Sequence, residues 1–169
     1  MESTSAIEKL ANDLITSLQR VEQRRQQWQT VTKPLVLATL NEIAEKIKLN
    51  WSVNVNDMLI NLESVFIAFN PMPTGIVEKS EINLVNKMRV GGFLSFSQTR
   101  TGQVVVWVSM PLLEGLEEGP ARNFTLETLD PEHVDATIVH QYMEKFLEEI
   151  IEWENESRDE IGFARHIGA

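Results

Sequence analysis

Carboxylates are the most numerous side chains in this sequence that could perform chemistry, and they gather at one end of it. Between Asp130 and Glu160 there are eleven acidic residues against two basic ones, which is net −9 of a total charge of −10. Paired carboxylates act in acid–base catalysis when burial raises the pKa of one of them. These carboxylates fall mostly on polar positions of an expected helix. We therefore expect a solvated acidic face, which would repel nucleic acid and anionic membranes.

Histidine offers the next chemistry to consider, which is metal binding. His140 and Glu144 are four residues apart on the same expected helix and could supply two ligands. His133 lies about 10.5 Å from His140 along that helix, too far to share an ion. No third ligand is evident, so we expect a surface histidine beside an acid. The sequence predicts no metal site and no cofactor.

Nucleophiles and phosphate loops are equally poorly supported. The chain has no cysteine, which excludes disulfides, thiolate metal sites and a thiol nucleophile. Ser95, Ser97 and Ser109 lie on expected strands without a Gly-x-Ser-x-Gly motif. The pair Gly91–Gly92 is not followed by a helix or a phosphate-binding lysine, so it indicates a bulge or a close backbone approach. We predict no catalytic residue, and an enzyme is the less favoured class.

One basic cluster, Arg20, Arg24 and Arg25, stands out in the N-terminal half. It suits a solvated helix face; alternatively, it neutralises part of the acidic C-terminal helix packed beside it. The candidates for contact with a partner protein come from these two charged regions: Arg24, Arg25, Glu148, Glu149 and Glu152.

The elements that position these residues begin with a helical region over 5–48. Apolar residues recur there at steps of three and four, making a stripe about six turns long: Ile7, Leu10, Ala11, Leu14, Leu18, Val21 and Trp28. Pro34 interrupts the pattern and could occupy the first turn of a second helix. Two helices and one kinked helix both fit the sequence.

From Trp51 to residue 127 the period of two predicts strands. The alternation of apolar and polar residues shifts by one position between 51–62 and 65–69. Such a shift turns the side chains to the other face, so it requires a turn or bulge near residues 62–64. The run 71–75, rich in proline, is a break. Residues 76–90 are ambiguous, and we expect irregular structure or a short helix there.

A hairpin is the clearest unit of the strand region. Residues 91–97 and 103–109 are rich in β-formers and flank a loop ending in Gly102. The run Val104–Val108 is apolar on both faces, as in a central strand, and Pro111 is expected to end it. A flexible acidic loop over 112–120 and one more strand near Phe124 complete the region.

The acidic C-terminal segment is expected to be a helix over 130–156. Asp130 suits its cap and Pro131 its first turn. Its apolar face would pack inward: Ile138, Val139, Tyr142, Met143, Phe146, Leu147, Ile150 and Trp153. The tail 157–169 keeps apolar residues and is expected to dock. The four tryptophans, on or near apolar faces, are expected to be core anchors; alternatively, one or two of them lie in an interface with a partner protein.

These elements predict an α+β fold in a single domain, 1–169. A mostly antiparallel sheet of four to six strands would be covered on one face by the long N-terminal and C-terminal helices. The N-terminus lacks the basic start and apolar core of a secretory signal, and the apolar runs are too short for a membrane helix. We therefore expect a cytoplasmic protein. Its two long terminal helices also offer a surface for homodimerisation.

Part of the sequence resembles the small chaperones of type III secretion systems in bacteria. The similar stretches are the strand that continues into Met110-Pro-Leu-Leu, and a later helix ending in Phe146-Leu-Glu-Glu-Ile-Ile-Glu-Trp153. In that family, a strand ending in a Leu-Pro-Leu-like run leads to a helix with a Phe and a Trp near its end. The resemblance covers about a third of the chain and carries no functional residue. The long N-terminal helix and residues 112–128 depart from the pattern.

Two functions follow as hypotheses. The first is a non-enzymatic protein-binding module, such as an adaptor, assembly factor or chaperone-like protein, whose partner is another protein or a second copy of itself. The second is a small-molecule-binding or hydrolytic domain with a pocket between helix and sheet. A buried polar cluster in that cleft would favour the second hypothesis.

Overall fold

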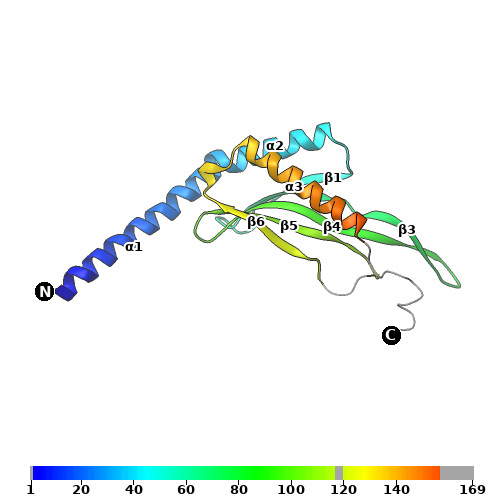
Figure 1. Ribbon diagram of the computed structural model, residues 1–169, viewed down its shortest axis with the longest axis horizontal. Coiled ribbons are helices and arrows are strands. Elements are labelled where there is room, and N and C mark those ends of the chain that lie inside the picture. Colours follow the sequence, from blue (N-terminus) through cyan, green and yellow to red (C-terminus); the bar gives the residue numbers. More distant parts are fainter. Residues whose placement is uncertain (1, 117–119, 157–169) are drawn as a thin grey trace.

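A computed structural model describes residues 2–116 and 120–156, and it has an α+β fold. A long helical run comes first, six strands follow, and one helix closes the described part of the chain (Figure 1). The strands are β1 (Trp51–Asn56), β2 (Ser64–Phe69), β3 (Met72–Lys79), β4 (Leu84–Gln98), β5 (Val104–Leu113) and β6 (Asn123–Leu129). The expected docking of the tail 157–169 lies outside the described residues.

The N-terminal region is one continuous helical run with an irregular turn inside it. It consists of α1 (Glu2–Gln27), a π-helical turn η1 (Trp28–Thr32) and α2 (Lys33–Lys46). Of the two alternatives, one interrupted helix is therefore the observed one. Pro34 is the second residue after the wider π turn. In a regular α-helix its ring would crowd the carbonyl of Thr30, so the π turn separates two regular helices where an α turn would be strained.

The sheet is antiparallel throughout its described pairs, in the order β1-β2-β4-β5-β6. The long strand β4 organises it. Its C-terminal half pairs with β2 and its N-terminal half with β3, while β5 pairs with β4 on the other side from Arg89 to Gln98. The β3–β4 ribbon therefore extends beyond the rest of the sheet (Figure 1). The predicted hairpin is confirmed, with backbone hydrogen bonds closing its turn between Thr99 and Gly102.

Two expectations about the strands are wrong. Residues 76–90 are not irregular or helical; they form parts of β3 and β4 around a turn at 80–83. The spacing of their apolar residues suits either a helix or a strand, and pairing between β3 and β4 selects the strand. Nor does Pro111 end β5, which continues to Leu113. The β5–β6 register ends at Ser109, so β5 is paired only with β4 around Pro111, and proline is tolerated at such an edge.

The core lies between one face of the sheet and two helices, α2 and α3 (Ala136–Asn155). Val106 at the centre of β5 is fully buried, as expected of a central strand. Helix α2 contacts β1 and β2, and α3 contacts β4 and β5. The predicted α+β class and antiparallel sheet are thus confirmed. Cover by the whole N-terminal helical region is not, because α1 projects away from the sheet (Figure 1).

Helix α3 starts later than the sequence suggested. Residues Pro131–His133 form a separate 3-10 turn, η2, and Asp130 makes no capping hydrogen bond to it. The cap of α3 is Asp135, whose carboxylate accepts a hydrogen bond from the Ile138 N–H at 2.8 Å. Two acids near a helix start both suit a cap, and only the backbone decides which is used. No helix in the described ranges is long and apolar enough to cross a membrane.

Candidate protein-binding surface

Helix α1 carries an apolar face that nothing in the described structure covers. We call this face the α1 stripe. At about 100° per residue its members span roughly 140° of the helix surface. The larger ones are 53–67% exposed. The stripe consists of Ile7, Leu10, Ala11, Leu14, Ile15 and Leu18.

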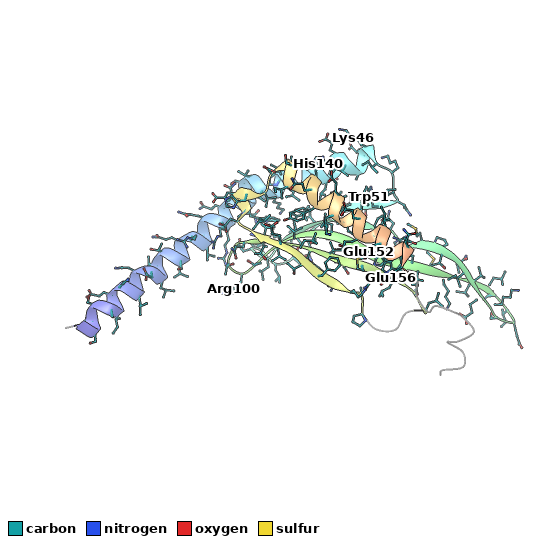
Figure 2. The ribbon with its side chains drawn as sticks, viewed as in Figure 1. Lys46, Trp51, Arg100, His140, Glu152 and Glu156 are labelled. Atoms are coloured by element: carbon teal, nitrogen blue, oxygen red, sulfur yellow. The ribbon has the colours of Figure 1, made fainter. Side chains whose placement is uncertain are left out.

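Within residues 2–116 and 120–156, α1 is attached to the body only at its C-terminal end. The β4–β5 turn lies against it so closely that a Cβ added to Gly102 would be 2.7 Å from the Arg24 Cβ and 3.0 Å from the Val21 carbonyl oxygen. The Arg24 side chain donates to the Thr101 carbonyl at 3.3 Å. Figure 2 shows Arg100 in this turn, near the base of α1. The α1 stripe begins beyond this contact and points into solvent.

A buried polar cluster fixes the base of the helix on the sheet. The carboxylate of Glu63, 4% exposed, lies just before β2. It accepts hydrogen bonds from Trp28 Nε1 at 3.1 Å, Gln29 Nε2 at 2.6 Å and Lys33 Nζ at 3.2 Å. These three donors come from η1 and the first residue of α2. The π turn thus directs three side chains to one acceptor and sets the direction in which α1 leaves the body.

The charge state of Glu63 follows from this arrangement. Burial raises the pKa of its carboxyl, but hydrogen bonds from Lys33, Trp28 and Gln29 outweigh burial and hold the pKa below its ordinary value. The cluster also reaches β4, because the Glu63 N–H donates to Gln98 Oε1 at 3.1 Å. A carboxylate that is ionised at neutral pH and accepts three hydrogen bonds at one oxygen is a structural acceptor, whereas acid catalysis needs a raised pKa. Nothing in the sequence around Glu63 indicated this role.

The predicted interface arginines are mostly engaged within the chain. Arg24 forms an ion pair with Asp130 at 2.9 Å, and Arg25 approaches Glu22 at 3.8 Å. Arg24 therefore pairs with the first acid of the acidic C-terminal segment, as the alternative hypothesis expected, but neither ion pair reaches the acids of α3 itself. Helix α3 starts beside the α1–α2 junction and runs away from α1 (Figure 1), which carries its acids out of reach.

The predicted interface acids lie on the outer side of α3. We call Glu148, Glu149 and Glu152 the α3 acids. Glu148 and Glu152 are exposed, and Glu149 forms a salt bridge with Lys145 one turn away at 3.2 Å. Figure 2 shows Glu152 near the end of α3. The structure therefore leaves the α3 acids accessible but does not bring them together with the arginines.

The histidines offer no built metal site among the described residues. His140 is exposed, and its Nδ1 hydrogen-bonds the Ala136 carbonyl at 2.7 Å. One group of ligating side chains does converge, Asp130 with Glu132 and His133. Its two outer members are exposed, and Asp130 is already paired with Arg24. This group carries no functional assignment.

Apolar side chains are also exposed elsewhere. The β1–β2 loop exposes Met58 and Ile60, and the end of the β3–β4 ribbon exposes Ile82 and Leu84. The exposure of these two groups was not predicted, because alternating apolar residues look the same in a sequence whether or not a neighbouring element covers them. Neither group forms a continuous face comparable in length to the α1 stripe.

The sheet face opposite the core carries a half-buried aromatic group. Phe93 contacts Trp107 edge-on, with ring centroids 4.9 Å apart, and Phe66 lies beside Phe93. The Trp107 indole N–H donates to Ser97 Oγ at 2.9 Å. Trp107 is thus not a core anchor, unlike the three other tryptophans, which are buried.

One cavity opens between the end of α3 and the β3–β4 ribbon. It has a volume of about 310 Å³, and its lining includes Met72, Ile76, Arg89 and Trp153. The Arg89 guanidinium lies 5.1 Å from the Trp153 ring and forms an ion pair with Glu154. The cavity has the helix–sheet position expected for a small-molecule pocket. Its cation, however, is already held by an aromatic ring and an acid.

Comparison with known proteins gives no assignment. No protein-family model, curated protein or solved structure matches this chain. The resemblance to type III secretion chaperones therefore rests only on the residues quoted for it. The function has to be argued from the geometry of the chain itself.

Proposed function

We propose that this protein is a non-enzymatic protein-binding module of the cytoplasm, an adaptor, assembly factor or chaperone-like protein, that binds through the α1 stripe. The observation that carries the proposal is the projection of a 26-residue helix with an uncovered apolar face. An acidic chain of net charge −10 without cysteine suits a cytoplasmic protein partner better than nucleic acid or membrane.

The energetics of a free α1 support this proposal. Helices that gain little from tertiary packing are marginal in water, since nucleation is costly and propagation adds little per residue. Fully burying one Leu or Ile side chain contributes roughly 1.5–3 kcal/mol. The α1 stripe has five such side chains, at positions that an apolar helix or groove recognises through spacings of three and four. A covering partner would stabilise both the helix and the complex.

Supporting features come from the base of the helix. The Glu63 cluster and the Gly102 contact direct α1 away from the body before any partner arrives. Such preorganisation lowers the entropy lost on binding. A helix attached at one end by specific hydrogen bonds is a suitable presenter of a binding surface.

The second function, small-molecule binding, is favoured by one observation, the Arg89 cavity. A carboxylate ligand would have to displace Glu154 from Arg89. Ligand-induced thermal stabilisation by small carboxylic acids, abolished in Arg89→Leu, would support this second function. Stabilisation that persists in Arg89→Leu would place the ligand elsewhere.

The test of the main proposal compares two matched variants. Leu14→Glu puts a charge in the middle of the stripe, whereas Thr16→Glu puts the same charge on the opposite face of α1. Tagged wild-type protein should retain a defined partner, identified by mass spectrometry, from extracts of its source. We expect Thr16→Glu to retain that partner and Leu14→Glu to lose it. Equal retention by both variants would contradict the use of the stripe.

A further inference from the structure

We infer that the α1 stripe pairs with the α1 stripe of a second copy of this chain, with the two helices antiparallel. This inference rests on the proposed function and names its partner. It follows from the spacing, the charges and the free length of α1.

The spacing of the stripe is the same in both directions. Ile7, Ala11, Leu14 and Leu18 are separated by four, three and four residues, and Leu10 and Ile15 flank them symmetrically. The midpoint of the whole set lies between residues 12 and 13. An antiparallel second copy centred there places Ile7 opposite Leu18 and Ala11 opposite Leu14. Each large residue of this face then meets an apolar position in the partner.

Charge favours the antiparallel order over the parallel one. Glu8 and Asp13 outnumber Lys9 in the N-terminal half of α1, whereas Arg20, Arg24 and Arg25 outnumber Glu22 near its C-terminal end. Antiparallel pairing brings the acidic turns of each helix towards the basic end of the other. It also opposes the two helix dipoles. Parallel pairing would place the two basic ends of the helices together, which is unfavourable.

The body leaves room for this pairing. The β4–β5 turn contacts α1 at Val21, Arg24 and Arg25, beyond the last residue of the stripe. In the antiparallel register the residues opposite 20–22 are Ser3, Thr4 and Ser5 of the second copy, which are small and polar. The overlap of residues 3–22 is about 30 Å long, between five and six turns. The two bodies would lie at opposite ends of the paired helices.

Such an interface has two-fold symmetry, so each copy uses the same patch. It closes on itself and leaves no repeat of the patch exposed. A second copy of the chain thus covers the apolar α1 stripe without any other protein.

Purified protein tests the pairing directly. Light scattering after size exclusion should give twice the chain mass for wild type and Thr16→Glu. Leu14→Glu should give the mass of one chain, with unchanged tryptophan fluorescence showing that the body remains folded. Because the chain has no cysteine, Ile7→Cys and Leu18→Cys introduce single thiols. A mixture of these two proteins should cross-link with a short thiol reagent, whereas each alone should not.

Three results would overturn the inference. Wild type that stays monomeric has no self-pairing; the proposed function would then survive only if capture of another protein still depends on Leu14. A dimer that persists in Leu14→Glu uses a different surface. Cross-linking of Ile7→Cys with itself indicates parallel helices, since antiparallel pairing separates these two thiols by about 16 Å along the axis.

Discussion

Replacing Glu63 with glutamine tests whether the buried polar cluster holds the base of α1 on the sheet. The wild-type carboxylate accepts hydrogen bonds from Trp28, Gln29 and Lys33. Glutamine keeps the shape and one acceptor oxygen but loses the charge opposite Lys33. Hydrogen bonds to charged groups contribute about 1.5–3 kcal/mol and neutral ones about 1 kcal/mol. Lys33 is one-fifth exposed, so water compensates it in part.

We therefore expect Glu63→Gln to lower the free energy of unfolding by about 2–3 kcal/mol at neutral pH. In a chain of this length that corresponds to a fall in Tm of about 4–12 °C. The effect should depend on pH in a definite direction. The pKa of Glu63 is lowered by folding, so its contribution is complete above the unfolded pKa. The contribution disappears as the pH falls through the folded pKa, and the gap between wild type and variant should then close.

Urea unfolding followed by tryptophan fluorescence at pH 7 and in the acidic range measures both quantities. Glu42→Gln is the matched control, because it removes a carboxylate from an exposed pair with Lys46 at 2.5 Å. Exposed pairs of this kind contribute little to stability because water screens them. A Glu63→Gln variant as stable as Glu42→Gln would refute the role assigned to the cluster. A stability gap that stays constant with pH would refute its electrostatic origin.

Three further predictions concern other parts of the chain. Val106→Asp buries an unpaired charge in β5 and should cost several kcal/mol or prevent folding, so a soluble, stable variant would contradict the central position of β5. Gly102→Ala should lower the Tm more than Gly75→Ala. Both glycines have φ near +80°, but of the two only Gly102 has a neighbour within 3 Å of the added Cβ. Equal losses of stability would contradict the close contact between Gly102 and α1. Changing all three α3 acids to Gln should shift stability by less than about 1 kcal/mol, and melts should show stability rising modestly with salt; a large loss would mean that these acids are paired internally.

The β4–β5 hairpin shows what could be predicted from sequence. A run of β-formers that is apolar on both faces leaves few choices other than a central strand, and Gly102 supplies the positive φ of the turn. The order of helices and strands was accessible for the same reason. Residues 76–90 were not, because their apolar spacing suits two elements and only pairing with β3 selects the strand.

The candidate binding surface was harder to predict, because it depends on which part of an apolar helix face the rest of the chain leaves uncovered. Trp28 and Leu14 belong to the same helical stripe in the sequence, yet Trp28 is fully buried and Leu14 is 60% exposed. Periodicity shows that a face is apolar but not whether this chain covers it. Glu63 was missed because its three donors come from about 30 residues away. The predicted arginines were on the right helix, but Arg24 serves to attach it to the body.

Amide hydrogen exchange across residues 5–20 tests the central claim, that the α1 stripe is a binding surface, most directly. The account predicts protection of these amides in wild type at high protein concentration and loss of that protection on dilution. Thr16→Glu should behave like wild type, and Leu14→Glu should exchange freely at every concentration. Exchange of wild type at the rate of an unprotected chain, both alone and with any captured partner, would contradict the claim. So would protection that is identical in wild type and Leu14→Glu.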